Sequence, residues 1–97
     1  MTEPLDILVV DDEEPLRRLL VRAGQKDARF KVDTASDYHE ALEKLSSNGY
    51  QLVITDKDMP GPSGIELIRK IRETHAIPIF LCSGRLTDEA AEEAEKA

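Results

Sequence analysis

Short runs of apolar, often β-branched residues recur along the chain and alternate with segments that have a helical spacing of apolar positions. Nearly continuous apolar runs of this length are typical of strands buried on both faces of a parallel sheet. Three runs are of this kind, whereas the run around Val32 alternates apolar and charged residues and indicates an edge strand. The pattern predicts strands at residues 5–10, 30–34, 52–55 and 78–82.

The segments between these runs carry apolar residues three and four positions apart, as amphipathic helices do. Helix-capping signals, in which Asp or Ser is followed three residues later by Glu, stand at Asp37 and Ser63. The first helix also carries Arg17, Arg18 and Arg22, which we expect to form a solvated face. The expected apolar faces are Leu16, Leu19, Leu20 and Ala23 in the first helix, Tyr38, Ala41, Leu42 and Leu45 in the second, and Ile65, Ile68 and Ile71 in the third.

Four successive strand–helix units, the last helix expected at residues 89–97, predict a doubly wound α/β sheet with right-handed crossovers. A chain of 97 residues is too short for two independent cores, and no linker interrupts it. We therefore expect one domain over residues 1–97. In such sheets, ligands bind beyond the carboxyl ends of the strands, where the strand order reverses.

Acidic residues stand at these strand ends. Asp11 and Asp12 follow the first predicted strand, and Asp56 and Asp58 follow the third. Each could simply cap a helix or turn. If the two strands are neighbours, however, at least three carboxylates meet, and they need a shared proton or cation. Oxygen ligands suit Mg²⁺, a carboxylate at the metal can attack phosphorus, and Ser83 could donate a hydrogen bond to a phosphoryl oxygen.

Composition narrows the function further. Thirteen basic and twenty acidic residues give a net charge of −7, which disfavours direct binding to nucleic acid or anionic membranes. The single cysteine, Cys82, cannot form an internal disulfide and is expected to be an inert, buried thiol. The acidic N-terminal segment does not look like a secretory signal, and the apolar runs are too short to span a bilayer. We therefore expect a cytoplasmic protein.

Three motifs follow one another along the chain: LVVDDE at residues 8–13, VITDKDMP at 53–60 with Gly64 after it, and PIFLCSG at 78–84. Their order and spacing resemble those of response-regulator receiver domains of two-component signalling. The resemblance covers the whole chain and implies a flavodoxin-like fold with strand order 2-1-3-4. It also implies a phosphorelay module served by a sensor histidine kinase or a phosphotransfer protein, with no enzyme activity beyond its own phosphorylation and dephosphorylation.

The same resemblance implies a role for each acidic residue and for the serine. Asp56 would be the phosphoacceptor. Asp12 would ligate Mg²⁺ directly, Asp11 would assist through water, and Asp58 would offer its backbone carbonyl. Ser83 would be the switch residue that reads the phosphoryl group.

The chain departs from the receiver pattern at its C-terminal end. Receiver domains carry a fifth strand ending in Lys-Pro and a fifth helix, and this sequence has no counterpart of either. We therefore expect a C-terminally incomplete receiver domain in which residues 77–82 form an exposed edge strand. Because an open apolar edge is a template for strand pairing, we also expect homo-oligomers through this edge.

Three other functions remain open. The chain could be a truncated receiver-like interaction or dimerisation module that cannot cycle phosphate. Asp56-Lys-Asp58 also reads as the D-x-D of haloacid dehalogenase phosphohydrolases, although that motif normally follows the first strand and Pro60 stands where Thr or Val is expected. A toprim-like nucleotidyl-transfer domain would combine similar acids, but the net charge disfavours a DNA substrate.

Overall fold

A computed structural model of the chain describes residues 3–82, so the predicted helix at 89–97 and Ser83 lie outside the described residues. Strands and helices alternate as predicted, and each strand boundary agrees with the sequence prediction to within one residue. None of the described helices is long and apolar enough to cross a membrane. The elements are β1 (Leu5–Val10), α1 (Glu14–Gln25), β2 (Phe30–Ala35), α2 (Tyr38–Ser47), β3 (Leu52–Asp56), α3 (Gly64–Arg72) and β4 (Ile79–Cys82).

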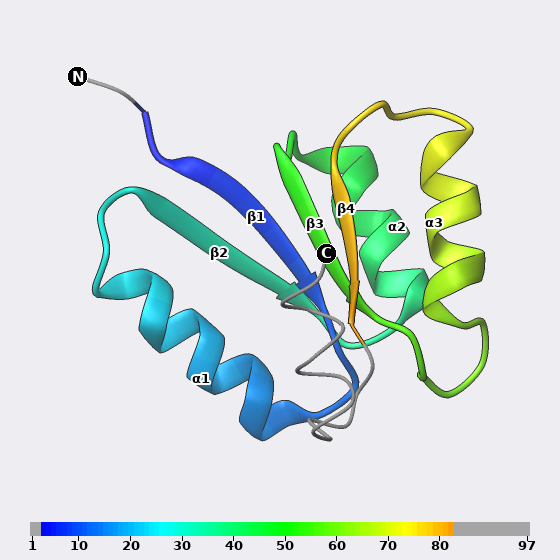
Figure 1. Cartoon of the computed structure of the whole chain (residues 1–97), viewed down its shortest axis with the longest axis horizontal. Coiled ribbons are helices and arrows are strands. Elements are labelled where there is room, and N and C mark those ends of the chain that lie inside the picture. Colours follow the sequence, from blue (N-terminus) through cyan, green and yellow to red (C-terminus); the bar gives the residue numbers. More distant parts are fainter. Residues whose placement is uncertain (1–2, 83–97) are drawn as a thin grey trace, which may run out of the picture.

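The four strands form one parallel sheet in the order β2-β1-β3-β4, which confirms the predicted doubly wound topology. Figure 1 shows α2 and α3 side by side along one face of the sheet and α1 on the opposite face, beside β2. The strand order reverses between β1 and β3, because β1 continues to β2 on one side and has β3 on the other. The carboxyl ends of β1 and β3 are therefore adjacent, at the place where doubly wound sheets bind ligands.

The core lies between the sheet and the pair α2 and α3. Leu8 of β1 and Val53 of β3 are register partners, and both are completely buried. Leu67 and Ile71 of α3 are buried against the same cluster, whereas Ile65 is exposed. The predicted apolar face of α3 was therefore wrong at Ile65: the buried face passes through Leu67 and Ile71.

Helix α1 packs more loosely than α2 and α3. It contains no buried residue, and Leu19, which we expected to pack, is 62% exposed. The helix lies over the edge strand β2, where Gly24 comes so close to Val32 that an added Cβ would stand 2.6 Å from the valine Cγ2. Because α1 rests on a sheet edge, the described part of the chain leaves much of its apolar face uncovered.

Strand β4 forms the other edge of the described sheet. Phe80 is 61% exposed, and Leu81 and Cys82 are also exposed. The expectation that residues 77–82 form an exposed edge strand is therefore confirmed for the described residues. The interpretation of the apolar run at 78–82 as a strand buried on both faces, with Cys82 as a core thiol, is wrong. The physical reason is position, since β4 pairs with β3 on one side and residues 3–82 supply no strand on its other side.

Candidate functional site

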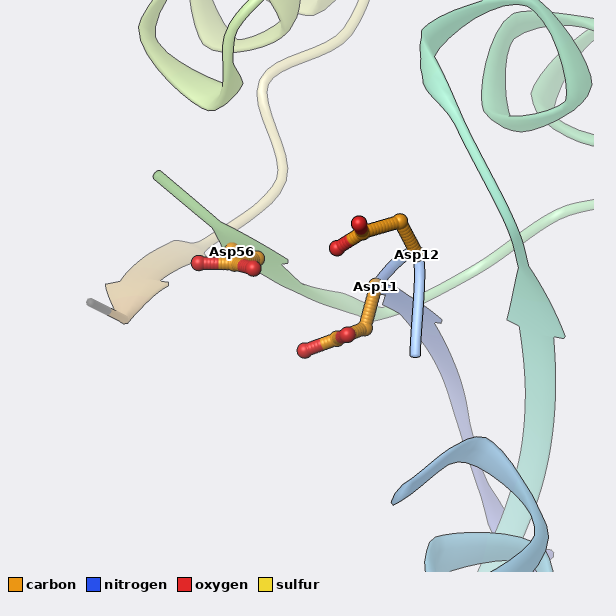
Figure 2. A group of neighbouring side chains, drawn as sticks. All are labelled: Asp11, Asp12 and Asp56. Carbon is orange, nitrogen blue, oxygen red and sulfur yellow. The ribbon is translucent and has the colours of Figure 1, made fainter. Parts of the chain in front are cut away.

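The strand order brings three carboxylates together at the carboxyl edge of the sheet. Asp11 and Asp12 directly follow β1, and Asp56 is the last residue of β3. One oxygen from each carboxylate lies within 4.8 Å of the other two. Figure 2 shows the three side chains gathered around a common space, with Asp56 approaching from one strand and the aspartate pair from its neighbour.

The three carboxylates differ in exposure. Asp56 is 5% exposed and Asp11 6%, whereas Asp12 is open to solvent. Burial raises the pKa of Asp56, and the carboxylates of Asp11, Asp12 and Asp58 raise it further, against the opposing effect of a hydrogen bond from the Asp58 N–H. That hydrogen bond joins the Asp58 amide nitrogen to Asp56 Oδ1 at 3.2 Å. The site thus concentrates negative charge on a poorly solvated carboxyl group, which a proton or a cation would relieve.

The turn after Asp56 is held by backbone contacts on two sides. The Lys57 N–H donates to the Cys82 carbonyl at 2.6 Å, and the Gly64 N–H donates to the Lys57 carbonyl at 3.0 Å. A Cβ at Gly64 would stand 2.1 Å from the Asp56 carbonyl oxygen, so only glycine lets the first turn of α3 pack this closely. Gly61, with φ of 78°, turns the chain in between. These contacts fix the backbone that carries Asp56 and Asp58.

The turn between β1 and α1 is held in a comparable way. The Asp11 N–H donates to the Ala35 carbonyl at 3.0 Å, and Asp11 Oδ1 accepts from the Glu13 N–H at 2.8 Å. The Arg17 guanidinium donates to the Asp11 carbonyl at 2.7 Å. Sequence reasoning missed this contact, because it assigned Arg17 to a solvated face. The sequence offered one signal for this contact, since Arg17 lies about one helical turn into α1 and its side chain can therefore reach back to the turn after β1.

The remaining predicted residues are placed as follows. Asp58 has an exposed side chain and meets Asp56 through its backbone N–H. His39 is exposed, as expected, and packs edge-on against Tyr38 rather than near the carboxylates. The donors gathered at the site are hard carboxylate oxygens, which fit Mg²⁺ and lack the nitrogen and sulfur ligands of a zinc centre. A carboxylate in this setting can also act as a nucleophile.

Comparison with known proteins gives consistent results. The family model described as "Response regulator receiver domain" matches residues 7–97. A curated relative, the sensor protein EvgS of Escherichia coli strain K12, is 40% identical over 97 residues, which cover 99% of this chain and 8% of EvgS. The chain spans about 8% to 37% of the length of the first curated relatives that it matches.

Solved structures of receiver domains also resemble the fold of this chain. A response regulator receiver protein from Pseudomonas putida matches with a TM-score of 0.79 and 29% identity, covering 99% of this chain and 81% of the other. The response regulator TrrA of Thermotoga maritima, solved in complex with Mg²⁺-BeF, matches with a TM-score of 0.69 and 33% identity, covering 95% and 97% of the two chains.

Proposed function

This chain belongs to the response regulator receiver domain family of two-component signalling, and on that premise we propose that it is a phosphoacceptor module in which Asp56 takes the phosphoryl group. The observation that carries this proposal is the arrangement of three carboxylates at the switch point of the sheet, with one oxygen from each within 4.8 Å of the others. Asp56 is the nearly buried member on the central strand β3. Its turn is pinned to β4 and α3, so the nucleophile is held in one place.

The carboxylates of Asp11, Asp12 and Asp56, together with the backbone carbonyl of Asp58, would hold Mg²⁺. When bound, the ion supplies positive charge that offsets the repulsion among these groups and the charge of an incoming phosphoryl group. The crowding of carboxylates supports this assignment, as does the Mg²⁺-BeF complex of TrrA, a family member that is 33% identical to this chain.

The phosphoryl donor would be a phosphohistidine on a sensor histidine kinase or a phosphotransfer protein. An Asp56 carboxylate oxygen attacks phosphorus, so that an O–P bond forms while the N–P bond of the donor breaks. The imidazole leaves with the electron pair and takes a proton from solvent. Water later hydrolyses the acyl phosphate to Asp56 and inorganic phosphate, and this self-directed chemistry is all the catalysis we assign. Ser83 would donate a hydrogen bond to a phosphoryl oxygen.

The test uses acetyl phosphate, a small acyl phosphate that needs no kinase. We expect the protein to gain one phosphoryl group, seen by intact mass, when acetyl phosphate and Mg²⁺ are both present. Asp56→Asn should block the gain because an amide is not nucleophilic, and Asp58→Asn, which keeps the backbone carbonyl, should retain it. An unphosphorylated wild-type protein, or equal labelling of the Asp56→Asn variant, would contradict the assignment.

A second candidate function, an interaction module that self-associates through β4, is favoured by a separate observation. The side chains of Phe80 and Leu19 are 61% and 62% exposed, and Leu81 is exposed beside Phe80. Within residues 3–82, β4 pairs only with β3, so its second edge can accept a strand from another copy. Sedimentation should show a homo-oligomer that Phe80→Glu weakens. If the oligomer forms but acetyl phosphate gives no labelling, the chain is this module and not a phosphoacceptor.

The remaining alternatives lose their support. Membership of the receiver family accounts for the D-x-D sequence at Asp56 and Asp58, which begins at the end of β3 and not after the first strand of the fold. A phosphohydrolase or a nucleotidyl-transfer domain is therefore no longer needed to explain it. We also propose a cytoplasmic location, where a chain with one cysteine stays reduced, and a protein rather than a nucleic acid or a membrane as partner, in keeping with a net charge of −7.

A further inference from the structure

Helix α1 begins differently from the other two helices. The side chain of Asp37 caps α2 by accepting from the Glu40 N–H at 2.8 Å, and Ser63 caps α3 in the same manner. The N-cap residue of α1, Glu13, makes no side-chain capping bond. This start of α1 directly follows Asp11 and Asp12, so whatever fixes it also fixes two of the three carboxylates.

Arg17 supplies the missing restraint from one turn inside the helix. Its guanidinium donates to the Asp11 carbonyl at 2.7 Å, and its own N–H makes an early backbone bond of the helix, to the Glu13 carbonyl at 3.1 Å. On the other side, the Asp11 N–H is held by the Ala35 carbonyl of β2. The Asp11 peptide is thereby tied to a neighbouring strand through its nitrogen and to the helix through its oxygen. A charged donor makes this hydrogen bond stronger than a neutral one.

The loose packing of α1 gives this bond its importance. No residue of the helix is buried, and its close approach to the sheet at Gly24 and Val32 lies at the far end from the carboxylates. The near end of α1 is therefore held against the end of β1 mainly by two hydrogen bonds to Asp11, one from the Glu13 N–H to its carboxylate and one from the Arg17 guanidinium to its carbonyl. Arg17 is half-buried there, which is unusual for a residue of a solvated helix face.

We propose that Arg17 is a positioning residue: by fixing the Asp11 carbonyl it holds the turn after β1 so that the Asp11 and Asp12 carboxylates face Asp56, and it thereby sets the affinity of the site for Mg²⁺. The proposal rests on the proposed function, because it concerns the same site. Arg17 acts through the Asp11 backbone and contacts neither the cation nor the phosphoryl group.

Arg18 provides a matched control on the same helical turn. It carries the same charge, but its guanidinium pairs with Glu14 at 2.5 Å and both side chains are well exposed. Arg18→Met and Arg17→Met each remove one positive charge and keep an unbranched apolar stem, but only the second breaks a bond to the turn after β1. High salt screens the long-range effect of a removed charge on Mg²⁺ binding, but it does not restore a positioning bond that has been lost.

The experiment measures Mg²⁺ binding directly by titration calorimetry, at low and at high ionic strength, on folded proteins verified by circular dichroism. We expect Arg17→Met to weaken Mg²⁺ binding about tenfold at both salt concentrations, as the loss of one charge-assisted hydrogen bond would. Arg18→Met should stay within about twofold of wild type, because exposed pairs contribute little. Equal Mg²⁺ affinities of the two variants, or a weakening that disappears at high salt, would overturn the proposal.

A second readout separates positioning from general damage to the fold. In phosphorylation by acetyl phosphate, the half-saturating Mg²⁺ concentration of Arg17→Met should rise by the same factor, while the rate at saturating Mg²⁺ stays within about twofold of wild type. A lower rate at saturating Mg²⁺ with an unchanged half-saturation point would overturn it. If Arg17→Met does not fold, Arg17→Lys, which lacks the planar guanidinium, takes its place. We expect Arg17→Lys to weaken Mg²⁺ binding about threefold, and an unchanged Mg²⁺ affinity would contradict the proposal.

The two proposals can fail separately. A wild-type protein that binds Mg²⁺ but is not phosphorylated refutes the phosphoacceptor role and leaves the calorimetric comparison of Arg17 and Arg18 intact. Wild-type phosphorylation with equal Mg²⁺ affinity in both variants refutes only the role of Arg17. A wild-type protein that does not bind Mg²⁺ refutes both.

Discussion

Replacing Asp56 by Asn should make the protein more stable in the absence of divalent cations, although it removes the group on which the proposed function depends. The asparagine has almost the same shape, and its side-chain oxygen can still accept the hydrogen bond from the Asp58 N–H. What changes is charge: the variant removes a 5%-exposed carboxylate that lies beside two others. Groups at functional sites often lower the stability of the fold in this way.

The magnitude follows from the spacing of the carboxylates. Two unit charges 4.8 Å apart repel by roughly 0.9 kcal/mol in bulk water and by roughly 3.5 kcal/mol at an effective dielectric constant of about 20. Asp12 is exposed, so its repulsion of Asp56 is near the lower figure, while buried Asp11 contributes more. After screening by solvent and salt, we expect Asp56→Asn to raise the free energy of unfolding by about 2 kcal/mol at pH 7.

The pH dependence has a definite sign. Burial and the neighbouring carboxylates raise the pKa of Asp56 in the folded protein. A raised pKa means that the folded state binds the proton more tightly than the unfolded chain does, whose aspartate pKa is about 3.9. The stability that this proton binding gives the wild type is complete below the unfolded-state pKa and is lost as the pH rises through the folded-state pKa. The advantage of the variant should therefore be largest at pH 7 and should disappear by about pH 4.

Urea unfolding followed by circular dichroism, in chelator and at fixed ionic strength from pH 7 to pH 4, measures this difference. Added Mg²⁺ at ten times its Kd should then stabilise the wild type by about 1.4 kcal/mol, and should stabilise the variant less. A variant that is less stable than wild type at pH 7, or a difference that grows toward pH 4, would refute the idea that the carboxylates repel one another across the site.

Two further predictions concern other parts of the fold. Burial alone would raise the pKa of Asp33, but hydrogen bonds that include those from Tyr50 and Lys44 lower it. Asp33→Asn should therefore lower the free energy of unfolding by about 1 kcal/mol above pH 5, and by progressively less as the pH falls below about 3.9. The same urea titration measures this loss, and a loss that grows in acid would contradict the prediction. Gly64→Ala should destabilise the fold by about 1–3 kcal/mol in thermal unfolding, because its Cβ would meet the backbone of Asp56. Gly49→Ala, with open space around it, should change stability by less than about 0.5 kcal/mol, and equal effects of the two substitutions would contradict the close approach at Gly64.

Much of the fold could be predicted because its signals are local. The β-branched run that includes Val53 has few alternatives to a buried strand, and Asp37 and Ser63 cap their helices through bonds to residues only three positions away. The meeting of Asp11 and Asp56 needed one further rule, that ligand sites of doubly wound sheets lie at the carboxyl ends of strands where the order reverses.

What could not be predicted depends on how elements pack. Helix α3 has apolar residues that allow two overlapping faces, and its position beside α2 decides that Leu67 is buried and Ile65 is not. The apolar run alone predicted a buried Cys82, and only the lack of a counterpart to a fifth strand indicated that β4 lies at an edge of the described sheet and leaves Cys82 exposed. The bond from Arg17 to Asp11 requires knowing where α1 begins relative to the end of β1.

The measurement that tests the central proposal most directly is the location of the phosphoryl group. After treatment with acetyl phosphate and Mg²⁺, borohydride reduces an aspartyl phosphate to homoserine, so peptide mass mapping identifies the residue that carried it. We predict that the modified residue is Asp56 alone, in wild type and in Asp58→Asn. Homoserine at Asp12 instead of Asp56, or a phosphoryl group that survives borohydride on a peptide carrying Ser83 or His39, would contradict the assignment of Asp56 as the phosphoacceptor.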